Sequence, residues 1–122
     1  MTVDAIREHC LSKKGTSEDF PFDQDTLVIR VMNKIFVLIP LERWERGDPS
    51  INLKCDPAYA IELRETYSCI IPGFHMNKTH WNTVNIDPSE VTSTLLFDLI
   101  DHSYNLILNN LPKKVKAELS QL

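Results

Sequence analysis

The stretch Leu27–Ile39, which reads LVIRVMNKIFVLI, decides the fold of this chain. Its first half, Leu27–Met32, is rich in β-branched and large apolar residues and predicts a strand. Asn33 and Lys34 follow as a two-residue turn, since Asn tolerates the positive φ that such turns require. Ile35–Ile39 then predicts a second strand that is apolar on both faces. This pattern favours a central strand, or one that is covered on both sides.

Three helices are expected around this hairpin. Thr2 can cap a first helix, because an apolar stripe with helical spacing follows it. Asp56 and Pro57 begin a second helix, since Asp caps and Pro loses no hydrogen bond at the first helical position. Asp87–Glu90 combines an N-cap, a first-turn Pro and a capping-box Glu, and predicts the start of the strongest helix. Pro112 ends that helix.

The remaining segments complete a domain of the α+β class. Short strands are expected at Ile51–Lys54, Ser68–Phe74 and His80–Ile86, and a polar loop at Thr16–Thr26. The predicted order is therefore α-β-β-β-α-β-β-α. Helices packed on a mostly antiparallel sheet make this a two-layer α+β domain that spans residues 1–122.

Composition limits the possible functions and compartments. The 122 residues include 13 Lys and Arg against 17 Asp and Glu, a net charge of −4, whereas a strongly basic nucleic-acid binder would show the opposite sign. The longest apolar run, Ile35–Leu41, is interrupted by Pro40 and is far shorter than a membrane span. Cys10, Cys55 and Cys69 are an odd number without a CxxC pair, which indicates free thiols in a reducing cytosol. We therefore expect a cytoplasmic protein that does not enter a membrane.

The residues that could carry chemistry do not form a complete site. His75 and His80 are five residues apart, with no acid or Cys within the run to complete a zinc set. Cys55 precedes a helix N-terminus, which favours a thiolate, but the neighbouring Asp56 opposes that effect. Asp101–Ser103 reads Asp-His-Ser, yet adjacent helical residues point about 100° apart and cannot hydrogen-bond in series. We expect no catalytic residue, no metal and no cofactor.

Strand alternation points to a surface instead. Aliphatic residues alternate with Trp81 in His80–Ile86, and with Asn52 and Lys54 in Ile51–Lys54. If helices cover the aliphatic face, the opposite face shows Trp81, Lys54 and Asn52. An aromatic side chain beside a cation can stack a base or anchor a protein partner. The alternative is that the loop before Trp81, or the third helix, covers its ring.

Five segments of the chain also form a familiar set: Phe20–Phe22, Arg30–Phe36, Asn52–Pro57, Ile71–Asn82 and Asp101–Tyr104. The most specific is PGFHMNKTHWN at Pro72–Asn82. Together they resemble the MmcQ/YjbR family of small bacterial proteins over nearly the whole chain, with Asn33 where the family usually has Gly. The resemblance implies the order α-β-β-β-α-β-β-α, similar to CyaY and to secretion chaperones. It implies no agreed catalytic residues, and a DNA-binding role is suggested for the family through likeness to a "double wing" fold.

The motif residues define a candidate binding surface that consists of Lys54, His75, Lys78, His80, Trp81 and Asn82. The first hypothesis is a cytoplasmic, non-enzymatic binding protein whose partner is DNA, bound weakly and in a salt-sensitive way. The second is a protein-interaction or chaperone-like module, as a homodimer or with another protein, because the second face of Ile35–Ile39 needs cover. The third is an enzyme that acts on a small anionic ligand with His75 or His80 as acid or base. A deep pocket that contains both His side chains would favour the third.

Overall fold

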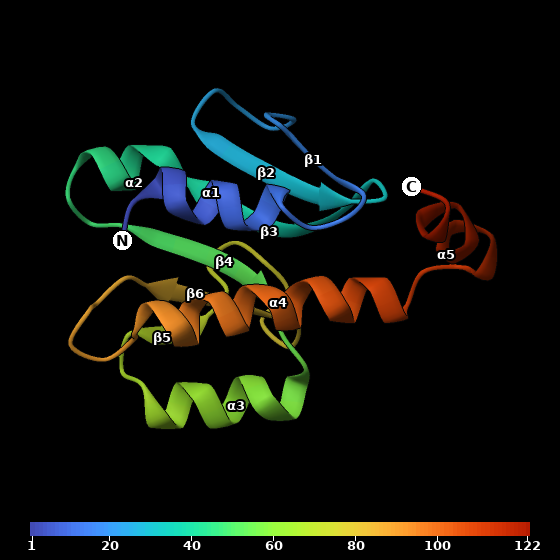
Figure 1. The fold of residues 1–122 in the computed structure, drawn as a ribbon. Coiled ribbons are helices and arrows are strands. Elements are labelled where there is room, and N and C mark those ends of the chain that lie inside the picture. Colours follow the sequence, from blue (N-terminus) through green and yellow to red (C-terminus); the bar gives the residue numbers. More distant parts are fainter.

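Six antiparallel strands form one sheet in the order β1-β2-β3-β4-β6-β5 in the computed structural model, which describes residues 1–122 (Figure 1). The strands are β1 (Thr16–Asp19), β2 (Thr26–Val31), β3 (Lys34–Pro40), β4 (Ser50–Lys54), β5 (Ile70–Pro72) and β6 (Trp81–Asn85). The helices are α1 (Val3–Leu11), α2 (Leu41–Glu45), α3 (Pro57–Thr66), α4 (Ser93–Asn109) and α5 (Lys113–Ser120). Figure 1 shows α1 and α4 lying across the same face of the sheet. The predicted α+β class and antiparallel sheet are confirmed.

The core lies between this face of the sheet and helices α1 and α4. Ile29, Ile51 and Val84, from strands β2, β4 and β6, are buried in one apolar cluster with residues of both helices. The Phe36 ring packs edge-on against the Tyr104 ring of α4, with 5.5 Å between the centroids. Each buried large apolar side chain contributes about 1.5–3 kcal/mol, so this face accounts for most of the stability of the fold.

The predicted hairpin is present, with its turn one residue earlier than expected. Met32 and Asn33 have φ values of 47° and 69°, and Val31 pairs with Lys34 across them. Two successive positive φ values are typical of the turn whose twist matches that of the strands. Asn33 is suited to this conformation, and its carbonyl accepts a hydrogen bond from the Arg30 guanidinium at 3.2 Å.

Two of the predicted helix starts are confirmed, and one is wrong. Thr2 caps α1 by accepting from the Ala5 amide at 3.1 Å, and Asp56 caps α3. The longest helix does not begin at Asp87–Glu90. It begins at Ser93, where the Thr92 hydroxyl accepts from the Leu95 amide at 3.1 Å.

The Asp87–Glu90 segment is a turn because its acids have other partners. The Asp87 carboxylate accepts from the amide and the hydroxyl of Ser89, which closes a local turn. The Glu90 carboxylate accepts from the amide and the hydroxyl of Ser68, and so it makes no capping box. A contact that is 22 residues distant in sequence therefore overrides the local helix signal.

Three elements lie outside the predicted order. The expected loop at Thr16–Thr26 begins with the edge strand β1, whose acids Glu18 and Asp19 pair with Arg7 and Arg30. Charged side chains are usual on an edge strand, since they discourage pairing with other molecules. The short helix α2 follows β3 directly, and α5 follows Pro112. None of the five helices is both long and apolar enough to span a bilayer.

Candidate functional site

The face of the sheet opposite α1 and α4 is lined with polar and aromatic side chains. Asn52 is paired with Thr83, and Lys54 with Trp81, across strands β4 and β6. The Thr83 hydroxyl donates to the Asn52 side-chain oxygen, which places both side chains on this open face. The alternation predicted for Trp81, Asn52 and Lys54 is confirmed.

A cleft of about 520 Å³ lies on this open face. Leu38, Asn52 and Thr83, from the central strands, line it. The loop before β2 contributes Phe22 and Asp23, β2 begins with Thr26, which also lines the cleft, and the loop between β5 and β6 contributes Phe74–Met76. The volume falls in the range of about 300–1,000 Å³ that is usual for small-molecule sites. We call this space the open-face cleft.

Large aromatic side chains from both loops remain exposed at the cleft. The exposed fraction is 64% for Phe22 and 65% for Phe74. The Phe74 amide donates to the Thr83 hydroxyl at 3.0 Å, and this bond holds the loop against the sheet. The next residue, His75, has a φ of 58° and its ring lies 4.0 Å from that of Phe74 between centroids. Exposed apolar groups beside a cleft are typical of binding sites.

The Ser50 hydroxyl is unusual among the groups that line the open-face cleft. Ser50 is completely buried, and its side-chain oxygen has no hydrogen-bond partner. A buried hydroxyl without a partner destabilises a fold by about 1–3 kcal/mol. Such groups are rare in native proteins and are often explained by a functional role. Ser50 therefore adds an unused hydrogen-bonding group to the lining of the cleft.

Arg43 of α2 lines the same cleft with a guanidinium held in place by the protein. One of its terminal nitrogens donates to the Asp48 carboxylate at 2.9 Å and to the Asn85 side-chain oxygen at 3.0 Å. The side chain is 28% exposed. Because Asp48 and Asn85 already hold the Arg43 guanidinium in place, little side-chain entropy is lost when it binds a ligand.

Of the six predicted surface residues, the structure brings two into the open-face cleft. His75 and Trp81 line it, and Trp81 is half-buried there. Lys54 lies on the same face by strand register but outside the cleft. The exposed His80 also lies outside it, so the two His side chains do not share a pocket.

The other two residues have structural partners. The Lys78 ammonium donates to the Gly73 carbonyl at 3.0 Å, which closes its own loop. Asn82 lies on the helix-covered face, is buried, and accepts from the Arg64 guanidinium of α3 at 2.7 Å. Arg64 also donates to the backbone carbonyls of Lys78 and Trp81. Asn82 thus ties α3 to β6 and does not share the surface with Trp81.

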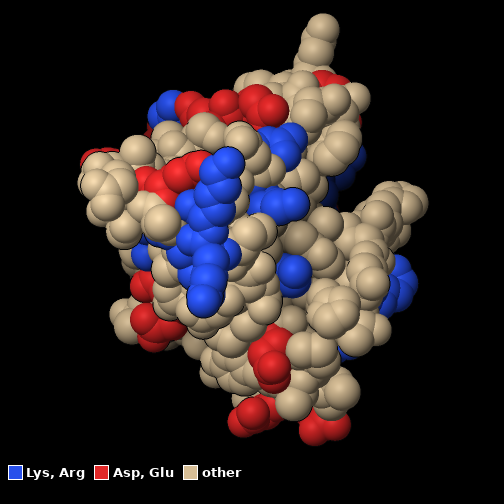
Figure 2. Space-filling model, turned by 90° about the vertical axis from the view of Figure 1, so that its right-hand side faces the viewer, with Lys and Arg blue, Asp and Glu red and all other residues tan.

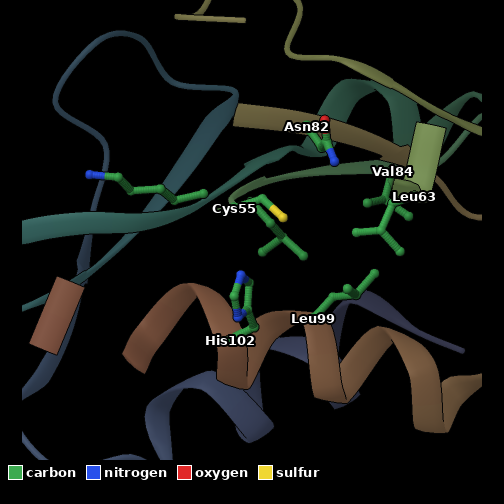
Figure 3. A pocket seen from close by; sticks show the side chains of 8 residues that line it. Cys55, Leu63, Asn82, Val84, Leu99 and His102 are labelled. Atoms are coloured by element: carbon green, nitrogen blue, oxygen red, sulfur yellow. The ribbon is translucent and has the colours of Figure 1, made fainter. Parts of the chain in front are cut away.

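Figure 3 shows a second, much smaller pocket, between α4 and strands β4 and β6. Its volume is about 10 Å³, and its polar lining includes Asn82, Cys55 and His102. The Asn82 amide nitrogen has no hydrogen-bond partner and points toward this space (Figure 3). A volume of this size holds about one water molecule and is too small for an organic ligand.

The three cysteines are buried and unpaired. Burial raises the pKa of the Cys55 thiol to about 11, and the nearby Asp56 carboxylate acts in the same direction. Burial likewise raises the pKa of Cys10 to about 12 and that of Cys69 to about 11. A thiol with such a pKa is protonated at neutral pH and is a poor nucleophile. These values favour a structural role for Cys55.

Asp101, His102 and Ser103 have three separate sets of partners. Asp101 pairs with His9 at 2.7 Å and with Lys13 at 2.6 Å. The His102 ring accepts from the Asp56 amide at 3.2 Å. The divergence expected for adjacent helical residues is confirmed.

Ser103 is bonded inside the core. Its hydroxyl donates to the Phe36 carbonyl at 2.6 Å and accepts from the Lys54 amide at 3.1 Å. It therefore links α4 to two strands of the sheet. Across the chain, no three side chains among His, Cys, Asp and Glu form a group that could hold a metal ion.

Lys and Arg side chains gather at one end of the molecule. Figure 2 shows the side where α5 lies, with blue side chains in the middle of the face and Asp and Glu around them. Helix α5 contributes Lys113, Lys114 and Lys116. This charge distribution differs from that of the open-face cleft, where Arg43 and Asp23 are the only Arg, Lys, Asp or Glu residues of the lining.

Comparison with known proteins gives a consistent result. The YjbR family model matches residues 11–106. Escherichia coli (strain K12) YjbR is 31% identical over 122 residues, which is all of both chains. YbdF of Escherichia coli O157:H7 is 40% identical over 96 residues, which is 78% of this chain and 75% of YbdF. The crystal structure of Deinococcus radiodurans protein DR2400 superposes with a TM-score of 0.88 and 35% identity, covering 98% of this chain and 88% of that one.

Proposed function

The chain belongs to the YjbR family, and we propose that it is a non-enzymatic binding protein whose ligand occupies the open-face cleft. One observation carries this proposal. The cleft combines two exposed aromatic rings at its loops with a completely buried, unpartnered hydroxyl at Ser50. Both features are unfavourable in an isolated fold and become favourable when a ligand covers them.

The lining indicates a ligand with a flat apolar body. Phe22, Phe74 and Trp81 offer aromatic surfaces, and Ile35 and Leu38 of β3 add aliphatic area. Aromatic rings gain about 0.5–1.5 kcal/mol from stacked or edge-on contacts beyond the burial of their area. The cleft also accounts for the second apolar face that was predicted for β3.

The hydrogen bonds of the cleft support binding without chemical conversion. A serine nucleophile needs an adjacent base, and the Ser50 hydroxyl has no hydrogen-bond partner of any kind. The Thr83 hydroxyl is engaged with the Phe74 amide and the Asn52 side chain. His75 lines the cleft and His80 does not, so the observation that would favour the enzyme alternative, a pocket that contains both His side chains, is not made.

A fluorescence titration with the neutral dye N-phenyl-1-naphthylamine tests the proposal. Its fused and pendant aromatic rings fit the expected ligand body. The Phe74→Ala and Phe22→Ala variants should each weaken binding about fivefold to tenfold, since each loses about 1 kcal/mol of ring contact. Both side chains are exposed, so the fold should be retained.

Phe20→Ala is the matched control for this titration. Phe20 is 48% exposed and belongs to the same loop as Phe22, but it does not line the cleft. We expect its affinity for the dye to equal that of the wild type. Equal losses in all three variants, or no loss at Phe74 and Phe22, would rule out the cleft as the site.

Weak, salt-sensitive DNA binding is the second candidate, and the group of Lys and Arg side chains in Figure 2 favours it. Neutralising about three phosphates gives a log–log salt slope near −3. Replacing Lys113, Lys114 and Lys116 with Gln should reduce that slope toward zero, whereas Lys54→Met with Lys78→Met should change it less. Binding of duplex DNA that is unaffected by salt would contradict this candidate.

The protein-interaction alternative stays a prediction. It is tested by sedimentation of the wild-type chain over a range of concentrations, because a homodimer dissociates on dilution. A monomer at all concentrations would leave only a heterologous partner for this alternative.

A further inference from the structure

We infer that the ligand of the open-face cleft is an aromatic acid, with its ring system against Phe74 and Trp81 and its anionic group directed to Ser50 and Arg43. This inference rests on the proposed function and specifies the ligand class. At the end of the cleft that contains Ser50 and Arg43, the free hydrogen-bonding groups are donors.

Ser50 and Arg43 lie close together because Asn85 connects them. Ser50 of β4 is directly opposite Asn85 of β6 in the sheet. Side chains at opposed positions of antiparallel strands lie about 4.5–5.5 Å apart at their Cβ atoms. The Arg43 guanidinium donates to the Asn85 side-chain oxygen at 3.0 Å. It is therefore held beside the strand pair that contains the free Ser50 hydroxyl.

Arg43, Asn52 and Ser50, at this end of the cleft, each have a hydrogen-bond donor that no protein group uses. An Arg guanidinium has only donors, and one terminal nitrogen of Arg43 supplies both of its bonds within the protein. The Asn52 side-chain oxygen accepts from Thr83, so its amide nitrogen remains as a donor. The Ser50 hydroxyl has no partner. A ligand that complements these groups carries acceptors, and a carboxylate forms the strongest bonds with a guanidinium.

Asp23 is the one acidic residue that lines the cleft, and its carboxylate is already bonded by its own loop. One oxygen accepts from the amides of Asp25 and Thr26, at 2.8 and 2.6 Å, and the other accepts from the Thr26 hydroxyl at 3.3 Å. The loop precedes β2, which β3 separates from the strand of Ser50. The negative charge of Asp23 thus favours placing a ligand anion at the opposite, Ser50 side of the cleft.

Two dyes with the same ring skeleton test the inference. N-phenyl-1-naphthylamine is neutral, and 8-anilinonaphthalene-1-sulfonate adds one sulfonate to it. We expect the native protein to bind the sulfonate dye about tenfold more tightly than the neutral dye. Ser50→Ala and Arg43→Gln should each lower the ratio of the two affinities from about tenfold toward about one.

The controls separate the cleft from general charge effects. Arg46→Gln removes the same charge from the C-cap residue of α2, where Arg46 pairs with Glu42 outside the cleft, and it should leave both affinities unchanged. Arg43→Gln also breaks a link to Asp48, but Ser50→Ala removes only an unpartnered hydroxyl and should keep the fold. The Ser50 result therefore remains decisive if the Arg43 variant is unstable.

The outcomes of the inference and of the proposed function are distinct. Equal affinity for the two dyes, or equal losses with both dyes in Ser50→Ala, would overturn the aromatic-acid inference and leave the cleft as a binding site. Loss of the sulfonate preference in Arg46→Gln would also overturn it, because the effect would then be long-range charge. If the neutral dye does not bind in the cleft, both the aromatic-acid inference and the proposed binding function are wrong.

Discussion

Each face of the sheet has a buried serine, and the two serines differ in hydrogen bonding. Ser103, which packs from α4 onto the helix-covered face, donates one hydrogen bond and accepts another. Ser50, which lines the open face, is equally buried and has no partner. A fully bonded polar group stabilises a core, whereas an unbonded one is a cost that a ligand can offset. The contrast indicates that one face supplies stability and the other a binding site.

The largest difference between the faces should appear in the free energy of unfolding when apolar side chains are truncated. Ile51→Ala, on the helix-covered face, should lower this energy by about 4 kcal/mol, because it removes a fully buried side chain and leaves a cavity. Phe74→Ala, on the open face, should change it by less than about 0.5 kcal/mol. Urea unfolding measures both. Similar losses in the two variants would show that the open face is also part of the core.

The serine pair sharpens the same comparison. Ser103→Ala should cost about 2–3 kcal/mol, since the Phe36 carbonyl and the Lys54 amide both lose a buried partner. Ser50→Ala should be neutral or slightly stabilising. Thermal unfolding of the two variants checks this, and a loss at Ser50 as large as at Ser103 would mean that Ser50 has a structural partner after all.

Trp81 lies between these extremes. Its ring is half-buried and lines the open-face cleft, so Trp81→Ala should lower the free energy of unfolding by about 1.5 kcal/mol. If the Trp81 ring were fully buried, Trp81→Ala would lower the free energy of unfolding by about 3 kcal/mol or more. A loss of that size would assign Trp81 to the core, and a loss below about 0.5 kcal/mol would make it a purely exposed ligand contact.

The smallest expected effect is a pH dependence of stability caused by His102, on the helix-covered side of the sheet. Burial lowers the pKa of His102, which accepts from the Asp56 amide and so must be neutral in the fold. The unfolded chain therefore binds a proton at a higher pH than the native chain does. Stability is retained above the unfolded pKa of about 6.5 and falls as the pH decreases through the lower, folded pKa.

His102→Gln is the control for this pH dependence. Gln can still accept the Asp56 amide but does not titrate, so the variant should lose less stability between pH 7 and pH 5 than the wild type. Comparing the two chains cancels the contribution of the other titrating groups. An identical pH dependence in both chains would exclude His102 as a source.

The fold can be predicted from the sequence because the strongest turn and helix-cap patterns agree with the long-range contacts of the structure. The hairpin around Asn33 and the caps at Thr2 and Asp56 are each specified by neighbouring residues. The start of α4 is mispredicted because Glu90 bonds Ser68, a contact that no local pattern reveals. Strand β1 is missed because its polar side chains are those of an edge, and they do not alternate with apolar ones.

The candidate site is only partly predictable for a related reason. Alternation correctly places Trp81 on the open face, and the same alternation, applied to the next residue, would have assigned Asn82 to the buried face. Ser50, Arg43 and Phe22 come from three other segments, and only the tertiary fold brings them to one cleft.

The most direct test of the binding site is an NMR titration of the wild-type chain with N-phenyl-1-naphthylamine, followed through its backbone amide shifts. We expect the largest shifts on Phe74–Met76 and on Asn52, Trp81 and Thr83, and no shifts of the amides of α1 and α4. Shifts centred on the amides of α1 or α4, or spread evenly over the chain, would contradict a ligand site on the open face.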